Sequence, residues 1–412
     1  MFKKVCGTKD ILPDEVASWQ KLENTARKVF STYNYQEIRT PVIEDATLFN
    51  RTLGTTTEIV QKQMFLIHNQ EETYALRPEG TASIVRSYLE NSLDKTTGFI
   101  KLYYIGPMFR LERPQKGRLR QFHHIGCEAI GSGDANLDIE IISLANQLLK
   151  GFGISDYKIN LNSLGCANDK QNLSVNLKKS LNNETKNLCS DCQERLKNNV
   201  LRVLDCKNEA CQKIVKKHCS DQGHLCPDCL THFETVKAGL KNLGIVFQVQ
   251  PLLVRGLDYY NRTVFEITHG GLGSQDAIGA GGRYNNLVSQ LGGPDLGGIG
   301  FAFGVERLLL ALADQPKESS KKLVYLITLG DAAKSEGLKI LEVLRASNIA
   351  CDTDYLNKSL KGAMRFANDL GANKVLILGD DELKNNLVTL KDMTNATQKQ
   401  IEIKNIIEEL KC

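Results

Sequence analysis

The segment Phe109–His124 carries the densest group of residues suited to phosphate chemistry. Five of its sixteen residues are cations: Arg110, Arg113, Lys116, Arg118 and Arg120. Guanidinium groups bind phosphate oxygens in pairs, and an aromatic ring such as Phe122 can stack on a base. We therefore predict a nucleotide or nucleic-acid site here. A solvated basic turn is the alternative, but it does not explain why Glu112 and Glu128 share these short strands.

The flanking residues must position these charges. The apolar runs Ile100–Phe109 and Ile125–Ile130 are typical of strands, and Pro114 and Gly117 favour a turn between them. The sequence therefore predicts a basic hairpin. Upstream, Leu76–Thr81 is predicted to end a strand and enter the helix Ala82–Leu93.

Arg307 stands at the start of an apolar helix predicted over Val305–Ala313, after a glycine-dense stretch over 270–304. A cation in the first turn opposes the helix dipole, whereas a bound anion there would use the guanidinium. Pairing of Arg307 with Glu306 is the alternative. The sequence has no G-x-G-x-x-G after a strand and no P-loop, so a phosphate site here belongs to neither class.

Polar residues also crowd the run Val254–Glu266. It contains Arg255, Asp258, Tyr259, Tyr260 and Arg262. A strand would place Asp258, Tyr260 and Arg262 on one face and Tyr259 on the other. Such a face could bind a small polar molecule. An ordinary half-exposed strand would also tolerate these residues, so both interpretations stay open.

Seven of the twelve cysteines fall between residues 189 and 229. They include two C-x2-C pairs, Cys189/Cys192 and Cys226/Cys229, and four thiolates can close a tetrahedral zinc site. We expect a structural zinc ion bound by these four residues. His218 and His224 are substitute ligands, and a set of thiols without a metal is the alternative.

The composition is that of a globular protein of two or three domains. Of 412 residues, 42% are hydrophobic and 24% charged, with a net charge of +4 that permits a polyanionic partner without requiring one. The N-terminal residues lack the apolar core of a signal peptide, and no run approaches the roughly 18 apolar residues of a membrane span. We expect a cytoplasmic protein without membrane contact, whose cysteines stay reduced.

The spacing of apolar residues divides the chain into predicted helices, strands and domains. A helix is predicted from Val16 to Tyr33, a strand-like run over Tyr35–Ile43, and a helix around Asp138–Leu149. The Lys-, Asn- and Cys-rich stretch after Cys166 indicates an inserted domain. Beyond a polar linker, strand-like and helical patterns alternate, which favours a small α/β domain. The predicted boundaries are 1–165 and 236–314 for the two parts of a catalytic domain, 166–235 for the insertion, 315–322 for the linker and 323–412 for the last domain.

Several of these segments together resemble the histidyl-tRNA synthetase family of class II aminoacyl-tRNA synthetases. The matching segments are Leu76–Thr81, Phe109–Glu128, Val254–Glu266, Gly281–Tyr284 and Gly298–Leu310. The resemblance implies an α+β catalytic domain with an antiparallel six-stranded sheet, a mostly helical insertion near the tRNA acceptor stem, and a C-terminal α/β anticodon-binding domain. It also implies a homodimer built partly through Tyr35–Gly54.

The resemblance implies an ATP-dependent ligase that makes histidyl-adenylate and passes histidine to tRNA(His). Arg110 would grip the α-phosphate, Arg255 would act where related enzymes use a metal, and Arg307 would hold the γ-phosphate, with Mg²⁺ bridging β and γ. Adenine would stack on Phe122. The ATP-binding residues implied are Arg110, Glu112, Arg118, Phe122 and Arg307.

The resemblance also implies a histidine pocket. Its residues are Glu79, Thr81, His124, Glu128, Tyr259, Tyr260 and Tyr284. Glu79 and Thr81 would bind the α-amino group, and Glu128 and Tyr260 the imidazole. Gln115 and Lys116 would face the tRNA acceptor end. The chain departs from the family's pattern at His124, which replaces Gln and introduces a pH-dependent charge, and at Leu111.

Two other functions remain as alternatives. A synthetase-like regulatory subunit of ATP phosphoribosyltransferase shares this fold, but is expected to lack the last domain and to have degraded histidine and ATP motifs, whereas this chain has Leu323–Cys412 and keeps Arg110, Arg255 and Arg307. A zinc-bearing RNA-binding module explains the cysteines but not Glu79, Tyr260 or Tyr284.

Overall fold

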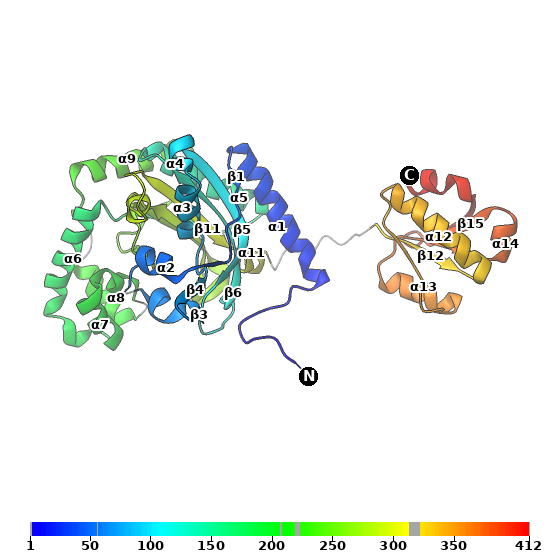
Figure 1. Ribbon diagram of the computed structural model, residues 1–412, viewed down its shortest axis with the longest axis horizontal. Helices are drawn as coiled ribbons and strands as arrows, with labels where there is room; N and C mark the ends of the chain where they lie inside the picture. Colours follow the sequence, from blue (N-terminus) through cyan, green and yellow to red (C-terminus); the bar gives the residue numbers. More distant parts are fainter. Residues whose placement is uncertain (1, 56, 207, 219–222, 313–321, 412) are drawn as a thin grey trace. The chain divides into compact units, whose positions relative to one another are not determined.

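The computed structural model describes residues 2–55, 57–206, 208–218, 223–312 and 322–411 (Figure 1). The chain divides into two compact units, Met1–Asp314 and Gln315–Cys412. The predicted linker 315–322 lies outside the described residues except for Lys322.

The first unit is built on an eight-stranded sheet. In spatial order its strands are β1 (Gln36–Glu37), β5 (Ile100–Phe109), β6 (Gln121–Ile130), β11 (Gly298–Gly304), β10 (Ala277–Arg283), β9 (Asn261–His269), β7 (Tyr157–Ser163) and β8 (Gln248–Val249). The six central strands are antiparallel, as expected. The two-residue strands β1 and β8 pair in parallel at the edges of the sheet. Strands this short are too short to show an alternation of apolar and polar residues, so the sequence did not predict them.

One face of this sheet is covered by helices. They are α1 (Pro13–Thr32), α5 (Ala135–Phe152), α9 (Pro227–Asn242) and α11 (Val305–Ala311). Their apolar sides form a core with alternate strand residues such as Ile125 and Cys127 of β6 and Ile299 and Phe301 of β11. Because side chains alternate along a strand, the residues between them face the other side, which carries the pocket described below.

That other side is flanked by a small second layer. It contains the three-stranded sheet β2–β4–β3 (Ile43–Asp45, Glu72–Leu76 and Phe65–Asn69) and the helices α2 (Ala46–Leu53), α3 (Thr81–Glu90), α4 (Leu93–Thr96) and α10 (Leu287–Gln290). Apolar side chains of α2 and α3 pack with Tyr104 and Met108 of β5. The predicted strand Tyr35–Ile43 is therefore two short strands in different sheets, separated around Pro41.

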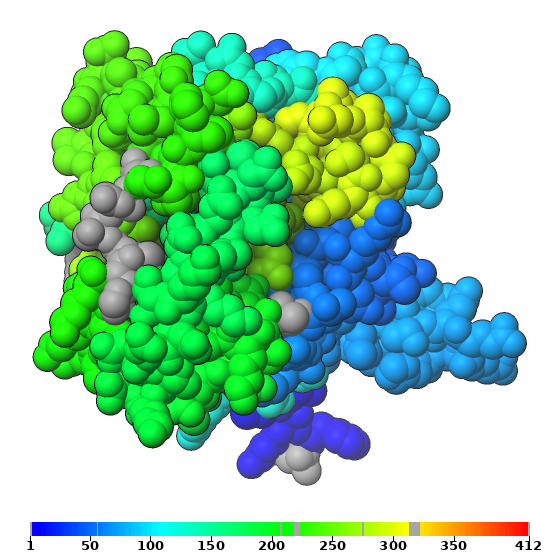
Figure 2. All heavy atoms as spheres, turned by 90° about the vertical axis from the view of Figure 1, so that its left-hand side faces the viewer, coloured from blue at the N-terminus to red at the C-terminus, as the bar shows by residue number. Residues whose placement is uncertain are grey.

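The inserted region is mostly helical. It contains α6 (Ala167–Asn182), α7 (Ser190–Asn198), α8 (Glu209–His218) and the first part of α9, with short 3-10 turns at Thr185–Asn187 and Val200–Asp205. The helices α6, α7 and α8 and the second 3-10 turn share a small core that includes Leu181, Cys192, Val203 and Cys211. In Figure 2 the insertion (green) forms a lobe beside the second layer (blue), from which the β3–β4 hairpin projects.

The second unit is a five-stranded mixed sheet with helices. Its strands, in spatial order, are β13 (Cys351–Thr353), β12 (Val324–Thr328), β14 (Lys374–Leu378), β15 (Leu387–Asp392) and β16 (Thr397–Glu402), and its helices are α12 (Asp331–Ala346), α13 (Leu360–Asp369), α14 (Asp380–Lys384) and α15 (Ile406–Lys411). The first three strands are parallel. The predicted α/β alternation is confirmed. The sequence pattern did not predict the edge strand β16, because it is polar and only its Ile401 is buried.

No helix among the described residues is both long and apolar enough to cross a membrane.

A buried ion pair fixes α5 to the sheet. Arg283 of β10 and Asp138 of α5 are both fully buried, with 2.6 Å between Nη2 and Oδ1. Arg283 also donates to the carbonyls of Ser132 (2.8 Å) and Asp134 (2.5 Å). These bonds compensate the desolvation of the guanidinium.

We expect Arg283→Ala to lower the free energy of unfolding of the first unit by about 3–5 kcal/mol, because it leaves the buried Asp138 carboxylate without its guanidinium partner. Urea denaturation followed by tryptophan fluorescence measures this, since Trp19 lies in the same core. Arg39→Ala is the matched control: Arg39 is 77% exposed in its pair with Glu37 and should change stability by about 1 kcal/mol or less. Equal effects of the two substitutions would contradict the prediction.

Candidate active site

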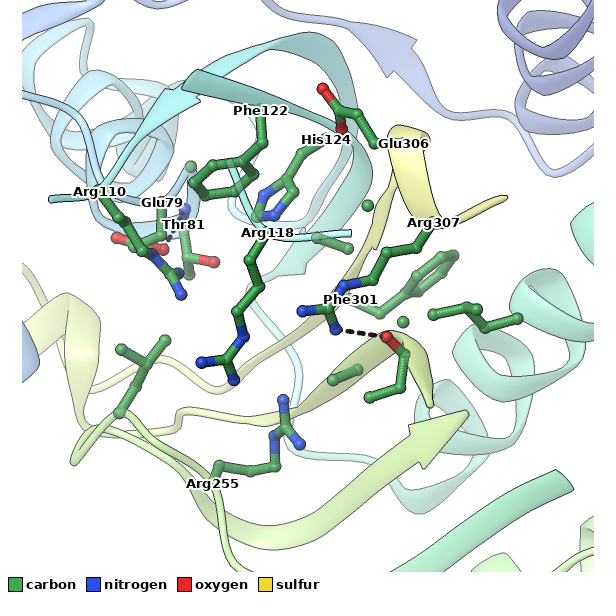
Figure 3. A pocket seen from close by; sticks show the side chains of 18 of the residues that line it. Glu79, Thr81, Arg110, Arg118, Phe122, His124, Arg255, Phe301, Glu306 and Arg307 are labelled. Atoms are coloured by element: carbon green, nitrogen blue, oxygen red, sulfur yellow. Dashed lines mark hydrogen bonds between the residues drawn. The ribbon is translucent and has the colours of Figure 1, made fainter. Parts of the chain in front are cut away.

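A pocket opens on the face of the large sheet opposite to α1, α5, α9 and α11 (Figure 3). Its walls come from the β5–β6 hairpin, the start of α3, the chain before β9, and the strands β10 and β11 with the start of α11. Among its lining residues are Glu79, Thr81, Arg110, Glu112, Arg118, Phe122, His124, Arg255, Tyr259, Tyr260, Glu306 and Arg307. Five separate segments of the sequence thus meet at one cavity.

Four guanidinium groups line this cavity, those of Arg110, Arg118, Arg255 and Arg307 (Figure 3). Burial lowers the pKa of Arg110 and of Arg307, and the charge of Arg118 adds to the lowering in both. Like charges held together in this way favour an anionic ligand, because such a ligand relieves their mutual repulsion.

Backbone carbonyls orient two of these groups. Arg110 Nε donates to the carbonyl of Pro78 (2.9 Å), while Arg307 donates through Nε to Gly117 (3.0 Å) and through Nη1 to Ala277 (2.6 Å). A carbonyl fixes the direction of a guanidinium without cancelling its charge. Arg110 Nη1 also lies 3.9 Å from Glu112 Oε1, which offsets part of its charge, and both guanidinium groups line the cavity that a ligand would enter.

Carboxylates lie closer to Arg118 and Arg255. Glu112 lies 3.3 Å from Arg118, and Arg255 Nη1 donates to Glu266 at 2.7 Å. Glu306 does not pair with Arg307. It accepts hydrogen bonds from the backbone N–H of His123 (3.0 Å) and contacts the ring Nδ1 of His123 (2.9 Å), so the local pairing considered as an alternative for Arg307 is wrong.

The end of the pocket near α3 is acidic and phenolic. The Glu79 carboxylate accepts the backbone N–H of Thr81 (2.7 Å) and of Ala82 (2.9 Å), and the hydroxyl of Tyr259 donates to it (3.3 Å). Burial raises the pKa of Glu79, and the hydrogen bonds from Ala82 and Thr81 oppose the rise. Tyr260 lines the same end, and burial raises its pKa to about 12, so its hydroxyl stays protonated.

Two predicted histidine-binding residues, Glu128 and Tyr284, lie one layer deeper. Glu128 is 1% exposed and accepts hydrogen bonds from Thr81 Oγ1 and Tyr284 Oη, both at 2.6 Å. Burial raises the pKa of Glu128 to about 8 despite these bonds. Gly300 lies opposite Glu128 in the sheet, and a Cβ at Gly300 would meet the carboxylate oxygen at 1.8 Å. Glycine is therefore required at this position of β11.

The run Val254–Glu266 is not one strand. β9 begins only at Asn261, and Arg262 has a positive φ of 46°. Tyr259 and Tyr260 consequently both line the pocket, whereas strict alternation would have separated them. Asp258 instead accepts a hydrogen bond from Asn199 of the insertion (3.3 Å).

His124 lies among the arginines of the pocket (Figure 3). Burial lowers its pKa to about 3, with further lowering by Arg110 and Arg307. The pH-dependent charge expected at this position is therefore moved far below neutral pH. The ring of Phe122 meets that of His124 edge to face at 5.1 Å, and the guanidinium of Arg110 lies 5.4 Å from the Phe122 centroid.

The remaining predicted positions lie on the hairpin loop. Gln115 and Lys116 are exposed near its tip, outside the pocket lining. Gln115 pairs through its backbone with Arg118, so the loop is tied to the pocket wall. Leu111 is 41% exposed, and its N–H donates to the carbonyl of Gln63.

The predicted zinc ligand set needs correction. The pairs Cys189/Cys192 and Cys226/Cys229 lie in two separate groups rather than one. The side chain of His218 lies outside the described part of the chain, and His224 belongs to neither group.

Sequence reasoning missed two contributions to the site. Small residues of β10 and β11, among them Gly279, Ala280 and Ala302, line the cavity and leave it open. Lys170 of α6 donates to the carbonyls of Asp258 (3.0 Å) and Tyr260 (2.7 Å) and so holds the chain before β9. The alternation of glycine with bulky residues in β11 was a signal for the first, whereas nothing in the sequence marked Lys170.

Comparisons with known proteins agree with this architecture. Residues 7–308 match the family model of histidyl-tRNA synthetase, and residues 323–412 match that of the anticodon binding domain. The chain is 46% identical to the histidine–tRNA ligase of Halothermothrix orenii, covering 98% of this chain and 97% of the relative. It is 40% identical to that of Clostridioides difficile, covering 98% of each. The crystal structure of apo Staphylococcus aureus histidyl-tRNA synthetase superposes with a TM-score of 0.83, at 36% identity over all of both chains.

The antiparallel sheet with its arginine-lined pocket defines a class II aminoacyl-tRNA synthetase, an enzyme that binds ATP, an amino acid and tRNA. The chain belongs to the histidyl-tRNA synthetase family. Its reaction is the activation of histidine by ATP to histidyl-adenylate and pyrophosphate, followed by transfer of histidine to the 3′ end of its tRNA. This assignment stands over the regulatory-subunit alternative.

The lowered pKa of His124 leads to a prediction about acid stability. The folded protein keeps His124 neutral to about pH 3, whereas the unfolded chain protonates it near its ordinary value of about 6.5. Between these values the unfolded state binds one more proton, so the free energy of unfolding falls as the pH falls. In His124→Gln this contribution is absent. Urea denaturation at pH 7 and at pH 5 measures how far the free energy of unfolding falls between the two pH values. That fall should be smaller in the variant than in the parent chain by on the order of 1 kcal/mol. A variant that loses as much stability as the parent chain would contradict the pKa assignment.

Proposed function

We propose that the four pocket arginines form the machinery that activates histidine. The observation that carries this proposal is their convergence on one cavity whose other end is acidic and phenolic. A polyphosphate fits the first environment, and an amino acid with a protonated amino group fits the second.

In the first half-reaction two anions must meet. The histidine carboxylate attacks the α-phosphorus of ATP, a pentavalent centre forms, and pyrophosphate leaves with the electrons of the broken P–O bond. Fixed positive charge offsets the repulsion and stabilises the developing charge. We assign this task to Arg110, beside the acidic end, and to Arg255. Both guanidinium groups are already oriented by Pro78 and Glu266, so little reorganisation is needed.

The outer part of the pocket would bind the remaining phosphates and the adenine of ATP. Arg307 is assigned to the γ-phosphate, Arg118 to the phosphate chain, and Phe122 to stacking on adenine. Enzymes of this class use ATP with Mg²⁺. The Glu112 carboxylate lines the pocket and offers a hard oxygen ligand of the kind that Mg²⁺ shares with phosphates. A Mg²⁺ ion at the β- and γ-phosphates would supply additional positive charge.

Histidine would lie against α3. The Glu79 carboxylate and the Thr81 hydroxyl are assigned to its α-amino group, with the neutral His124 ring as a further acceptor beside Tyr259. Tyr260 and Glu128 are assigned to the imidazole. Glu128 already accepts two hydrogen bonds, but each carboxyl oxygen has more than one lone pair, so an imidazole N–H can still bind. Tyr284 then fixes the orientation of that carboxylate.

Such a pocket discriminates strongly. An amino acid without the imidazole N–H groups leaves buried polar partners unpaired, at about 1–3 kcal/mol each. Pockets that recognise a substrate by buried hydrogen bonds reach about 10⁴–10⁵ in discrimination, which makes a separate editing site unnecessary.

The remaining assignments concern the tRNA and the assembly. Gln115 and Lys116 are assigned to the acceptor end of tRNA(His), the insertion 166–235 to the acceptor stem, and residues 323–412 to the anticodon. Residues 1–165 and 236–314 form the catalytic domain in this scheme. We assign a homodimer contact to Tyr35–Gly54, where Val42 and Ile43 are apolar and 38% and 47% exposed. A cytoplasmic location fits the cysteines of the described residues, which are all free thiols.

The primary test is ATP–pyrophosphate exchange with Mg²⁺, without tRNA, against a panel of amino acids. Exchange with histidine alone is expected, because only histidine satisfies both Glu128 and Tyr260. Absence of exchange from folded protein would overturn the proposal, and exchange with several amino acids would overturn the assigned imidazole contacts.

Arg255→Ala should lower histidine-dependent exchange by about 10²–10³-fold or more, because one fixed charge at the reacting phosphate is lost. Folding should be retained, since Glu266 is 25% exposed and can be solvated. Arg365→Ala is the matched control: Arg365 is exposed in the second unit, and exchange needs no tRNA. Near-normal exchange in Arg255→Ala would remove the role assigned to Arg255.

A further inference from the structure

The cysteines of the insertion form two groups that the catalytic pocket does not use. The first group is Cys189, Cys192, Cys206 and Cys211, and the second is Cys166, Asp169, Cys226 and Cys229. Within each group the four ligand atoms lie within 4.8 Å of one another. We propose that each group binds one Zn²⁺ ion, and we call them the inner site and the neck site.

The spacing in the inner site is that of zinc coordination. Zinc–sulfur bonds of about 2.3 Å in a tetrahedron place the sulfur atoms about 3.8 Å apart. The Sγ atoms of Cys189 and Cys206 are 3.8 Å apart. Three of the four cysteines are buried, and four protein ligands with no open position are typical of a structural ion rather than a catalytic one.

Six of the eight proposed ligands lie at the starts of the helices α6, α7 and α9. Cys189 caps α7, with Cys192 in its first turn, and Cys226 caps α9, with Cys229 at the equivalent position. Cys166 and Asp169 have the same spacing at the start of α6. Free N–H groups and the positive end of the helix dipole favour thiolates there.

Backbone N–H groups donate hydrogen bonds to two of the sulfur atoms at the inner site. The N–H of Cys189 donates to Cys211 Sγ at 3.2 Å, and that of Asn208 donates to Cys206 Sγ at 3.4 Å. Bonds of this kind orient metal-bound thiolates. The combination of soft thiolates with tetrahedral spacing selects zinc over the harder divalent cations.

The neck site closes the insertion. Cys166 lies where the chain leaves the catalytic sheet after β7, and Cys226 and Cys229 lie where it returns in α9. The carboxylate of Asp169 already bridges the two ends, since it accepts the backbone N–H of Cys166 and of Cys226, both at 3.2 Å. A metal ion here would join two helix starts that lie about 60 residues apart in the chain, and such a constraint stabilises the folded insertion.

The neck site also adjoins the chain that carries Tyr259 and Tyr260. Lys170, one residue after Asp169, holds the carbonyls of Asp258 and Tyr260. Arg262 donates its N–H to the carbonyl of Gly165 (2.7 Å), immediately before Cys166. The ligands are therefore positioning residues for the histidine end of the pocket. This consequence rests on the proposed function, whereas metal binding itself does not.

The first test is the metal content of the full-length chain, purified under reducing conditions without chelators and measured by elemental mass spectrometry. We expect two zinc ions per chain, and one after either Cys189→Ser/Cys192→Ser or Cys226→Ser/Cys229→Ser. Cys351→Ser is the control, because Cys351 lies in the second unit outside both groups and should leave two. Zinc near zero in the folded parent chain would overturn the proposal.

A measurement on the unaltered chain covers the case in which a variant fails to fold. Replacement of zinc by Co²⁺ should give the visible absorption of a tetrahedral cobalt–thiolate centre at two equivalents, and saturation at one equivalent would overturn one of the two sites.

Kinetics of exchange separate the two sites. Loss of the neck ion should raise the KM for histidine at least about 5-fold more than the KM for ATP, while loss of the inner ion should change both alike. Equal changes after loss of the neck ion would overturn the positioning role. If the parent chain binds two zinc ions but shows no exchange, the proposed function fails and the metal sites stand.

Discussion

The structure depends on concentrating positive charge where two anions must react. Four guanidinium groups share one cavity, and the charge of Arg118 disfavours the charged forms of both Arg110 and Arg307. The protein holds Arg110 and Arg307 by backbone carbonyls, which direct them without neutralising them. The carbonyls of Pro78, Gly117 and Ala277 come from distant parts of the chain. The relative positions of the hairpin, β10 and α11 must therefore be rigid, and the sheet supplies that rigidity.

The large sheet supplies both rigidity and space for ligands because its two faces carry different side chains. Towards the helices, β11 presents Ile299, Phe301 and Phe303 to the main core. In alternation with them, its glycines and Ala302 leave room on the pocket side. One strand thus stabilises the fold with one set of side chains and makes space for ligands with the other. The close approach of Gly300 to Glu128 shows how little of that space is unused.

The insertion extends this arrangement by bracing the histidine end of the pocket. Asn199 and Lys170 both bond to the Asp258–Tyr260 chain, so contacts from the insertion reach the segment that carries the two tyrosines. The grouped cysteines would make that brace stiffer, because a metal ion at the neck fixes the helix that carries Lys170. Substrate recognition and insertion geometry are then coupled through a few hydrogen bonds rather than through a separate moving element.

The sequence by itself determined the local features: the basic hairpin, the principal helices, the α/β alternation of the second unit and the motifs that mark the family. These follow from periodicity, turn residues and short spacings, which act over a few residues. Only the tertiary structure decided which distant groups meet. It gave Arg307 two carbonyl partners instead of Glu306 and divided the C-x2-C pairs between two groups. It also placed both Tyr259 and Tyr260 in one cavity, because β9 begins only after them, at Asn261. A local pattern fixes the face on which a side chain lies, but its partner across the fold depends on how whole elements pack.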